Sequence, residues 1–374
     1  MKITRIQPFL VRNCMLVRVY TDAGIVGTGE AGLWAHHRWV YEAIQDLAEY
    51  YVGQDPRRIE HHAQVIARQT HFMGSVLSAA TSALDIALWD ILARSVDLPI
   101  YQLLGGKVRD KARVFANVVG DTLEARAESA RQQVSDGYQS LRTTPFFSNW
   151  AQQNATQRVK AAVEIVAAIR EAIGDEVDLG LEIHRNLPPE EAIMLGNELL
   201  PFRILYYEDP LAPESFEALA YVARHVNLPL AFGERNYSLY QFRDLIHSGS
   251  VSWIRADLSL AGGYTQVRKI AALAEASFIS IFPHLMGSPV NTAAFVQFDA
   301  ATPNCVLHES NRVLDHPLNE ILEQPLTLED GYILIPDGPG IGVEVREDKL
   351  SQFPFEPRTI QGRFRADGSV SNTG

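Results

Sequence analysis

Acidic residues and one histidine recur at nearly even intervals through the second half of the chain, each after a short apolar run. The six positions are Glu182, Glu208, Glu234, Asp257, His284 and Glu309. Successive positions lie 23 to 27 residues apart, and the stretches between them have helical periodicity. One strand, one helix and two short loops fit that interval. We therefore expect parallel βα units whose strand ends carry these groups to one mouth of a barrel, where such barrels place their chemistry.

The rest of the chain has a different pattern. Residues 1–29 alternate like an antiparallel meander, and helical patterns follow at 34–51, 56–73 and 75–96. No eighth βα helix of the usual kind follows Glu309, and residues 327–345 return to strand and turn. We predict an α+β domain over residues 1–110, a barrel over 111–325 and a segment over 326–374 that returns to the first domain. The polar tail after Pro357 is expected to fray.

Composition excludes some classes of function. The chain has 374 residues, a formal charge of −12 and a pI near 5.4, which argues against a nucleic-acid partner. Its two cysteines, Cys14 and Cys305, are far apart and indicate core thiols in a reducing compartment. The N-terminus lacks an apolar leader, and no run reaches membrane-spanning length. We expect a cytoplasmic protein without a membrane partner.

Three carboxylates on adjacent strand ends form a candidate metal site. Glu182, Glu208 and Glu234 offer hard oxygen ligands, which suit Mg²⁺ because it leaves coordination sites for water and substrate oxygens. Without a cation, three anions this close would repel and raise one another's pKa. Each acid alone could be an unrelated surface residue, since most acids are exposed. The even spacing of all three favours the metal.

Two histidines are candidates for acid–base chemistry. His284 follows Asp257 by one βα unit, and a carboxylate that holds one imidazole nitrogen orients the ring and raises its basicity. This predicts a general base, although a lone histidine can also be a core or loop residue. His184 lies two residues past Glu182, on the same side of a strand, and so faces the mouth. It is either a general acid for a leaving hydroxyl or a partner of the metal site.

The motifs together resemble the enolase superfamily, in particular the acid-sugar dehydratases of its mandelate racemase subgroup, over nearly the whole chain. The motifs are TDAGIVGTGE, SALDIALWDILARSVDLPIYQLLGG, YYEDPL, GER, RADLSLAGGYTQVRKIAALAE, FPHLMGSP and PNCVLHES. The pair Glu182 and His184 is similar to the Asp-x-His of galactonate and mannonate dehydratases. The resemblance implies an α/β fold, a modified (β/α)7β TIM barrel with an N-terminal α+β capping domain. It also implies Mg²⁺ on Glu182, Glu208 and Glu234.

The resemblance assigns further roles: His284 with Asp257 as base, His184 as acid, and Glu309 as a hydrogen-bonding partner of the developing enediolate. The chain departs from many relatives at the end of the second barrel strand. Arg142 and Thr144 stand where those relatives have Lys-x-Lys. An arginine stays protonated and is a poor base, but it could clamp a substrate carboxylate or hydroxyl. A base on only one face of the α-carbon favours elimination over racemisation. Glu182 also replaces the aspartate of these relatives.

These observations predict a Mg²⁺-dependent dehydratase of an aldonate or aldarate, such as galactonate, mannonate or gluconate, that yields a 2-keto-3-deoxy acid. The alternatives are an epimerase or lactone cycloisomerase on the same scaffold, and a non-catalytic relative. Specificity is expected from the cap, over residues 13–24 and 33–38. Trp34, His36 and His37 either line the distal pocket or form an exposed helix start. The expected partners are a small sugar acid and further copies of the chain.

Overall fold

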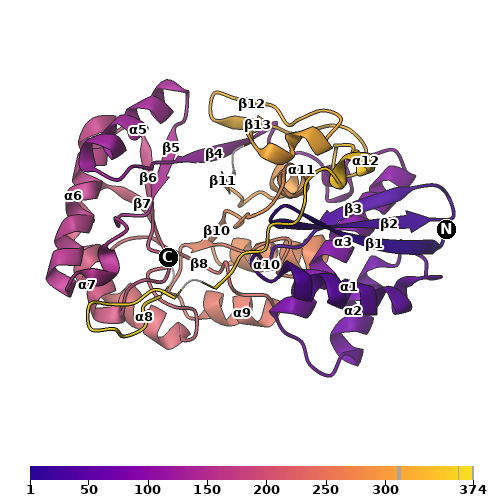
Figure 1. Cartoon of the computed structure of the whole chain (residues 1–374), viewed down its shortest axis with the longest axis horizontal. Helices are drawn as coiled ribbons and strands as arrows, with labels where there is room; N and C mark the ends of the chain where they lie inside the picture. The colour runs from indigo at the N-terminus through magenta and orange to yellow at the C-terminus, as the bar shows by residue number, and fades with distance from the viewer. Residues whose placement is uncertain (310–312, 361, 373–374) are drawn as a thin grey trace.

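The N-terminal part of the chain is an antiparallel sheet covered by helices. A computed structural model describes residues 1–309, 313–360 and 362–372. The sheet has the order β1-β2-β3, and helices follow it (Figure 1). The bounds are β1 (Ile3–Val11), β2 (Cys14–Thr21), β3 (Val26–Glu30), α1 (His37–Tyr51), α2 (Ile59–Gln69), α3 (Ser75–Ser95) and α4 (Ile100–Leu103). The meander and the three long helices match the sequence prediction.

Helix α3 packs against β3 more closely than side chains would allow. A Cβ at Gly27 would lie 2.1 Å from the carbonyl oxygen of Ala87, and one at Gly29 would lie 2.0 Å from that of Ala83. Glycine permits such an approach because it has no Cβ. The helix is long and apolar enough to cross a membrane by composition, but most of it is buried inside the molecule. Its apolar character is therefore that of a core helix.

The second part is a closed parallel barrel. Its strands are β4 (Lys111–Asn117), β5 (Ser140–Thr143), β6 (Asp178–Glu182), β7 (Ile204–Glu208), β8 (Leu230–Phe232), β9 (Trp253–Ile254), β10 (Ser280–Ile281) and β11 (His308–Glu309). Neighbours in the chain pair in parallel from β4 to β10. A parallel bridge from Ile281 to Cys305 joins β10 to the start of the last strand, and β11 pairs with β4. This closure removes both sheet edges.

Seven helices alternate with the barrel strands in the described residues. They are α5 (Leu123–Ser135), α6 (Ala155–Ile173), α7 (Pro189–Glu198), α8 (Phe216–His225), α9 (Leu239–His247), α10 (Gly263–Ala276) and α11 (Pro289–Ala301). Asn154 and Ser238 begin α6 and α9 with capping boxes, in which cap side chain and third-residue side chain satisfy each other's backbone N–H. After β11, the described helices are only the short η3 (Pro317–Ile321) and α12 (Glu347–Leu350). The predicted (β/α)7β barrel with its cap is confirmed.

The C-terminal segment contacts both the barrel and the cap. Strands β12 (Leu328–Glu329) and β13 (Tyr332–Leu334) form a hairpin, and β13 pairs antiparallel with the start of β4. Gly340 then accepts a hydrogen bond from the backbone N–H of Ile100, at 2.9 Å. The domain boundaries at residues 110 and 325 stay a prediction.

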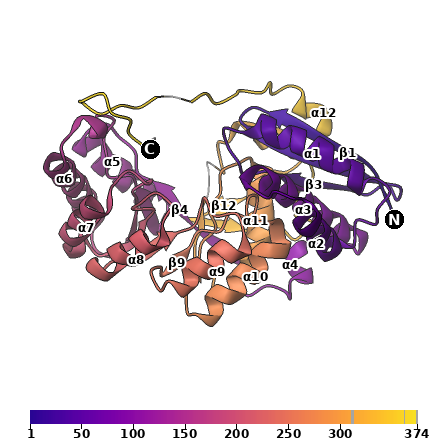
Figure 2. The same ribbon diagram turned by 90° about the horizontal axis from the view of Figure 1, so that it is seen from below.

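The prediction of a frayed tail is wrong for the described residues. After α12 the chain crosses from the cap to the barrel, as Figure 2 shows in yellow. Ser371, near its end, is only 5% exposed. Composition indicated fraying, but tertiary contacts described below hold this segment.

The cap and the barrel meet at a buried carboxylate. Glu30, at the end of β3, accepts hydrogen bonds from the backbone N–H (2.8 Å) and hydroxyl (2.5 Å) of Ser288, at the start of α11. A Cβ at Gly287 would lie 2.6 Å from the Glu30 carboxylate. Burial raises the pKa of Glu30 to about 7, although the bonds from Ser288 partly offset this. The interface therefore favours the protonated acid.

The raised pKa of Glu30 predicts that ionisation of this carboxyl lowers the stability of the folded protein. In the unfolded chain Glu30 ionises near pH 4.5, and in the folded chain near pH 7, so the contribution of Glu30 to stability falls as pH rises between these values. Glu30→Gln keeps the shape and removes the titration. Its free energy of unfolding, relative to the unsubstituted protein, should improve by about 2 to 3 kcal/mol between pH 5 and pH 8. Urea unfolding at both pH values measures this. An equal difference at both would contradict it.

Candidate active site

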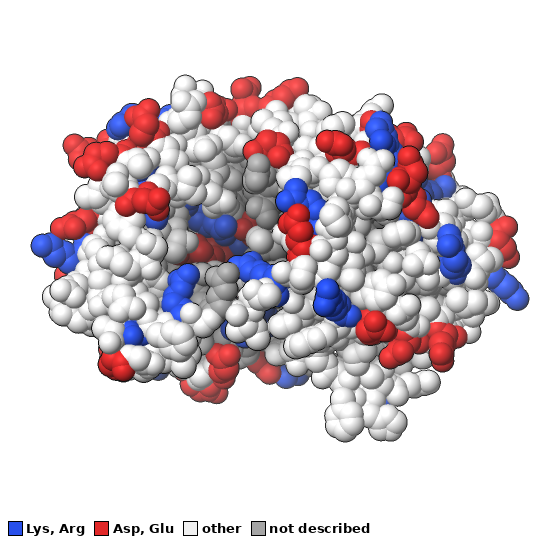
Figure 3. Space-filling model, viewed as in Figure 1, with Lys and Arg blue, Asp and Glu red and all other residues white. Residues whose placement is uncertain are grey.

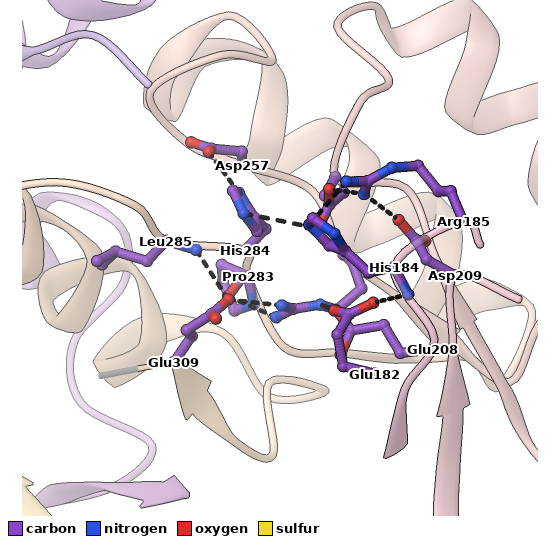
Figure 4. A network of polar contacts seen from close by, with 12 residues as sticks. Glu182, His184, Arg185, Glu208, Asp209, Asp257, Pro283, His284, Leu285 and Glu309 are labelled. Atoms are coloured by element: carbon purple, nitrogen blue, oxygen red, sulfur yellow. Dashed lines mark hydrogen bonds and ion pairs between the residues drawn. The ribbon is translucent and has the colours of Figure 1, made fainter. Parts of the chain in front are cut away.

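The strand-end groups meet in a hollow at one mouth of the barrel. Glu182 ends β6 and Glu208 ends β7, and the two residues are paired in register. Glu234 follows β8 by two residues, after a turn at Gly233, whose φ of +133° favours glycine. Figure 3 shows the hollow, with acidic and basic side chains inside it. Figure 4 shows these side chains gathered in one place, as the sequence led us to expect.

The three glutamates are arranged as a metal site would require. Their ligating oxygens all lie within 4.8 Å of one another, and all three residues are buried. Burial raises the pKa of Glu182 well above its usual value, and the negative charges of Glu208 and Glu234 raise it further. A divalent cation between them would reverse that effect, since it supplies the opposite charge. The donor set therefore fits Mg²⁺.

Three arginines also offset the buried negative charge. Arg255, which is fully buried, donates to Glu208 and to Glu309, both at 2.5 Å. Arg185 pairs with Glu234 and, at 3.0 Å, with Asp209. Arg142 donates to Glu309 at 2.8 Å.

Sequence reasoning missed Arg185 and Arg255. The one available signal for Arg255 was its place two residues before Asp257, on the same face of the strand.

His284 and Asp257 form the predicted pair. Nδ1 of His284 lies 2.8 Å from Oδ2 of Asp257, whose other oxygen accepts from the N–H and hydroxyl of Ser259, at 2.8 and 2.6 Å. The aspartate is therefore fixed, and it fixes the ring in turn. Burial lowers the pKa of His284, but Glu234 and the bond to Asp257 outweigh burial and raise it to about 9. The other ring nitrogen, Nε2, lies 3.6 Å from Glu234.

His184 lies near the mouth, but the predicted reason was wrong. It is not in a strand: His184 and Arg185 have φ of +56° and +65°, a left-handed turn directly after β6. Nε2 of His184 lies 2.7 Å from a guanidinium nitrogen of Arg185. Because a guanidinium only donates, Nε2 is the acceptor and the ring proton is on Nδ1. Burial and the charge of Arg185 lower the pKa of His184 to about 4.

The two histidines come from opposite sides of the mouth. Figure 4 shows Asp257, His284 and Glu309 on one side and His184 with Glu182 on the other. Such an arrangement can serve a proton removal and a proton donation on one bound molecule.

Glu309 is a hydrogen-bond acceptor in this arrangement. Its oxygens accept from Arg142, from Arg255 and, at 3.1 Å, from the backbone N–H of Leu285. Although burial acts in the other direction, these arginines hold the pKa of Glu309 well below its usual range. An ionised carboxylate has no proton to donate. Arg142 is a donor near Glu309 that also faces the glutamates, since it lies 3.7 Å from Glu182 and 3.4 Å from Glu208.

The remaining predicted substrate residues are not brought together. Thr144 accepts from Arg126 through its carbonyl, and in the described residues its hydroxyl has no bond to the site. Trp34 lies under the guanidinium of Arg358, 4.1 Å from the ring centroid. His36 stacks on Trp39, with ring centroids 4.1 Å apart, and His37 is buried. Trp34 is thus covered by the C-terminal tail, while His36 and His37 pack within their own helix or against the tail.

Comparisons with known proteins cover nearly the whole chain. The model of the mandelate racemase / muconate lactonizing enzyme N-terminal domain matches residues 8–105, and that of the enolase C-terminal domain-like family matches residues 125–349. A D-galactonate dehydratase of Verminephrobacter eiseniae is 37% identical over 362 residues, 93% of each chain. Another, of Pectobacterium atrosepticum, is 34% identical over 359 residues, again 93% of each.

Solved structures share the fold. An enolase from Agrobacterium radiobacter with bound Na and L-malate has a TM-score of 0.93 and 30% identity, and all of both chains is covered. A member of the enolase superfamily from Salmonella Typhimurium has a TM-score of 0.90 and 32% identity, over 94% of this chain and 98% of that one. The similarity extends over cap and barrel together.

The glutamate cluster predicts stabilisation by a cation. Mg²⁺ at about a hundred times its dissociation constant should stabilise the protein by about 2.7 kcal/mol, because it binds only the folded site. Glu182→Gln should abolish this gain and leave the metal-free melting temperature unchanged or higher, since burial already favours a neutral group there. Calorimetry with and without Mg²⁺ measures both.

The matched control is Asp175→Asn, which removes an exposed acid paired with Arg203 and should keep the gain. A cation response that survives Glu182→Gln would place the ion elsewhere.

Proposed function

Because the chain belongs to the mandelate racemase / muconate lactonizing enzyme family, we propose that it is a Mg²⁺-dependent acid-sugar dehydratase that forms a 2-keto-3-deoxy acid. The observation that carries this proposal is the pair of histidines on opposite sides of three buried glutamates (Figure 4). Relatives named D-galactonate dehydratase, 34 to 37% identical over 93% of the chain, support an enzyme of the hydro-lyase class.

In the proposed reaction the neutral form of His284 removes the C2 proton; a cation on Glu234 would offset the charge that most raises the pKa of this histidine and would thereby favour the neutral form. Its Nδ1 is held by Asp257, so Nε2 is the nitrogen that faces the substrate. Asp257 stabilises the imidazolium that forms, because a fixed carboxylate next to a new positive charge lowers its energy. The electron pair left at C2 spreads into the carboxylate of the substrate as an enediolate.

Two cationic groups serve the developing enediolate. Glu182, Glu208 and Glu234 would hold Mg²⁺, which when bound supplies positive charge at the substrate carboxylate. Arg142, which lies between Glu309 and the metal-binding glutamates, would donate to the same charge. This role replaces the expected hydrogen bond from Glu309, because Glu309 is an acceptor that orients Arg142. The arrangement is preorganised, since both arginine and glutamate are held before the substrate enters.

His184 completes the elimination. The C3 hydroxyl leaves with a proton from Nδ1 of His184, while Nε2 remains bonded to Arg185. The donor is the neutral imidazole, so His184 becomes an imidazolate, and the Arg185 guanidinium at Nε2 stabilises this negative charge until the ring is reprotonated. The enol product then tautomerises to the 2-keto-3-deoxy acid.

The presence of Arg142 also favours dehydration over racemisation. A racemase needs a base on each face of C2, and Arg142 stands where many relatives have a lysine base. An epimerase or lactone cycloisomerase would return deuterium or a rearranged acid without loss of water, so product analysis distinguishes them. A non-catalytic relative would bind Mg²⁺ without turnover. The homo-oligomer and the cytoplasmic location remain predictions.

The base is tested by His284→Asn. With D-galactonate and a panel of other aldonic and aldaric acids in D₂O, exchange of the C2 proton should fall at least about a hundredfold, because the variant lacks the group assigned as the base. Proton NMR follows the exchange. His247→Asn, an exposed histidine at the end of α9, is the control and should exchange normally. Exchange that persists in His284→Asn would mean that another group is the base.

The acid is tested separately by His184→Asn. C2 exchange should persist, whereas formation of the 2-keto-3-deoxy acid should fall at least about a hundredfold. The two rates are read by NMR and by mass on the same samples. If exchange and elimination disappear together, His184 is not specific to the leaving group.

A further inference from the structure

The C-terminal tail, residues 353–372, is anchored at the cap near the segments expected to set specificity. The backbone N–H of Glu356 donates to the carbonyl of Arg12 at 2.7 Å, and that of Arg12 donates to Phe353 at 3.3 Å. Further along, Arg358 covers the ring of Trp34. The tail therefore starts its crossing from the turn between β1 and β2 and the loop before α1.

The far end of the tail is a small hairpin on the barrel. The backbone N–H of Arg365 donates to Ser369 at 2.8 Å, and that of Ser371 donates to Arg363 at 2.9 Å. Gln152, in the long loop after β5, donates to the carbonyl of Phe364 at 2.8 Å. The hairpin thus rests on a βα loop at the mouth, and Figure 2 shows the tail bridging the two parts of the molecule.

The last described residue reaches the turn that carries His184. The side-chain amide of Asn372 donates to the carbonyl of Arg185 at 2.5 Å. The turn itself is strained, because His184 and Arg185 are both non-glycine residues in the left-handed region, where each costs about 1 to 2 kcal/mol.

Other contacts hold this turn from the barrel side. The N–H of His184 donates to Glu182 at 2.6 Å, and that of Arg185 donates to the carbonyl of Asp209 at 2.7 Å. Asn372 adds a contact to this turn from the C-terminal tail.

We propose that Asn372 is a positioning residue, through which the docked C-terminal hairpin holds the His184–Arg185 turn in the geometry for proton donation. The inference rests on the proposed dehydration. It gives the tail a role in the elimination step and none in the removal of the C2 proton, since His284 and Asp257 come from strands on the other side of the mouth.

The tail contributes little to the hydrophobic core and is held on the surface of the molecule mainly by hydrogen bonds. Phe353 packs against the core at the start of the tail, but the larger apolar side chains further along are mostly exposed: Ile360 is 94% exposed, Phe364 52% and Val370 77%. It therefore buries little apolar surface, and its hold depends on a few hydrogen bonds.

The tail also carries charge suited to the mouth. Between residues 358 and 372 there are three arginines and one aspartate, in a chain of net charge −12. A positive segment bonded to the turn of His184 would attract an anionic substrate.

The test compares single variants of the full chain. Asn372→Asp removes the donor to the Arg185 carbonyl, and Asn372→Gln restores an amide donor on a longer arm. Elimination should fall about tenfold in Asn372→Asp and recover at least partly in Asn372→Gln, while C2 exchange stays unchanged. Ser369→Ala is the matched control, since among the described residues its hydroxyl donates to Asp367 within the hairpin, and it should keep both rates.

A second measurement does not depend on turnover. Amide hydrogen exchange, read by mass spectrometry over residues 183–188, should be faster in Asn372→Asp than in the unsubstituted protein and normal in Ser369→Ala. Unchanged amide exchange in Asn372→Asp would overturn the proposed contact. An equal fall of elimination and C2 exchange would overturn the specific role for His184. Absence of dehydration in the unsubstituted protein would refute the proposed function, while the amide exchange would still decide the contact.

Discussion

Mutual repulsion of buried carboxylates is the constraint on which the site depends. Buried carboxylates gathered at one end of the barrel include Glu182, Glu208, Asp209, Glu234, Asp257 and Glu309. Charges out of water must be paired or neutralised. The chain meets this with Arg142, Arg185 and Arg255, but Glu182 has its nearest arginine, Arg142, only at 3.7 Å, and its pKa stays raised. A bound Mg²⁺ would complete the compensation, so the electrostatics that hold the site together are also those of the proposed chemistry.

The barrel strands position the residues of the site, and the cap and the C-terminal tail pack against the mouth of the barrel. Parallel strands bring one polar group each to the same mouth, which is why six positions far apart in sequence act on one small volume. The cap packs against the mouth through Glu30 and Ser288, and the tail crosses from the cap to the turn of His184. Both contacts depend on residues outside the barrel. The catalytic geometry is thus a property of the whole chain.

The sequence predicted the barrel and its strand-end residues because each βα unit repeats one acid or histidine after an apolar run. The pairing of His284 with Asp257 followed from neighbouring strands. Arg255 was missed because its spacing from Asp257 does not by itself distinguish an arginine inside the barrel from one on the surface. The left-handed turn at His184 was missed because a sequence indicates positive φ mainly through glycine, and His184 and Arg185 are not glycines. The tail was taken as frayed because polar composition does not reveal contacts such as that of Asn372.

The most direct measurement is the fate of C2 and C3 in a sugar acid incubated with the unsubstituted protein and Mg²⁺ in D₂O. D-galactonate is the first substrate, and NMR and mass spectrometry identify the product. The account predicts a 2-keto-3-deoxy acid that has lost one water. Deuterium at C2 without loss of water would contradict the proposed role of His184 and indicate epimerisation. A lack of both exchange and water loss across aldonic and aldaric acids would contradict the dehydratase itself.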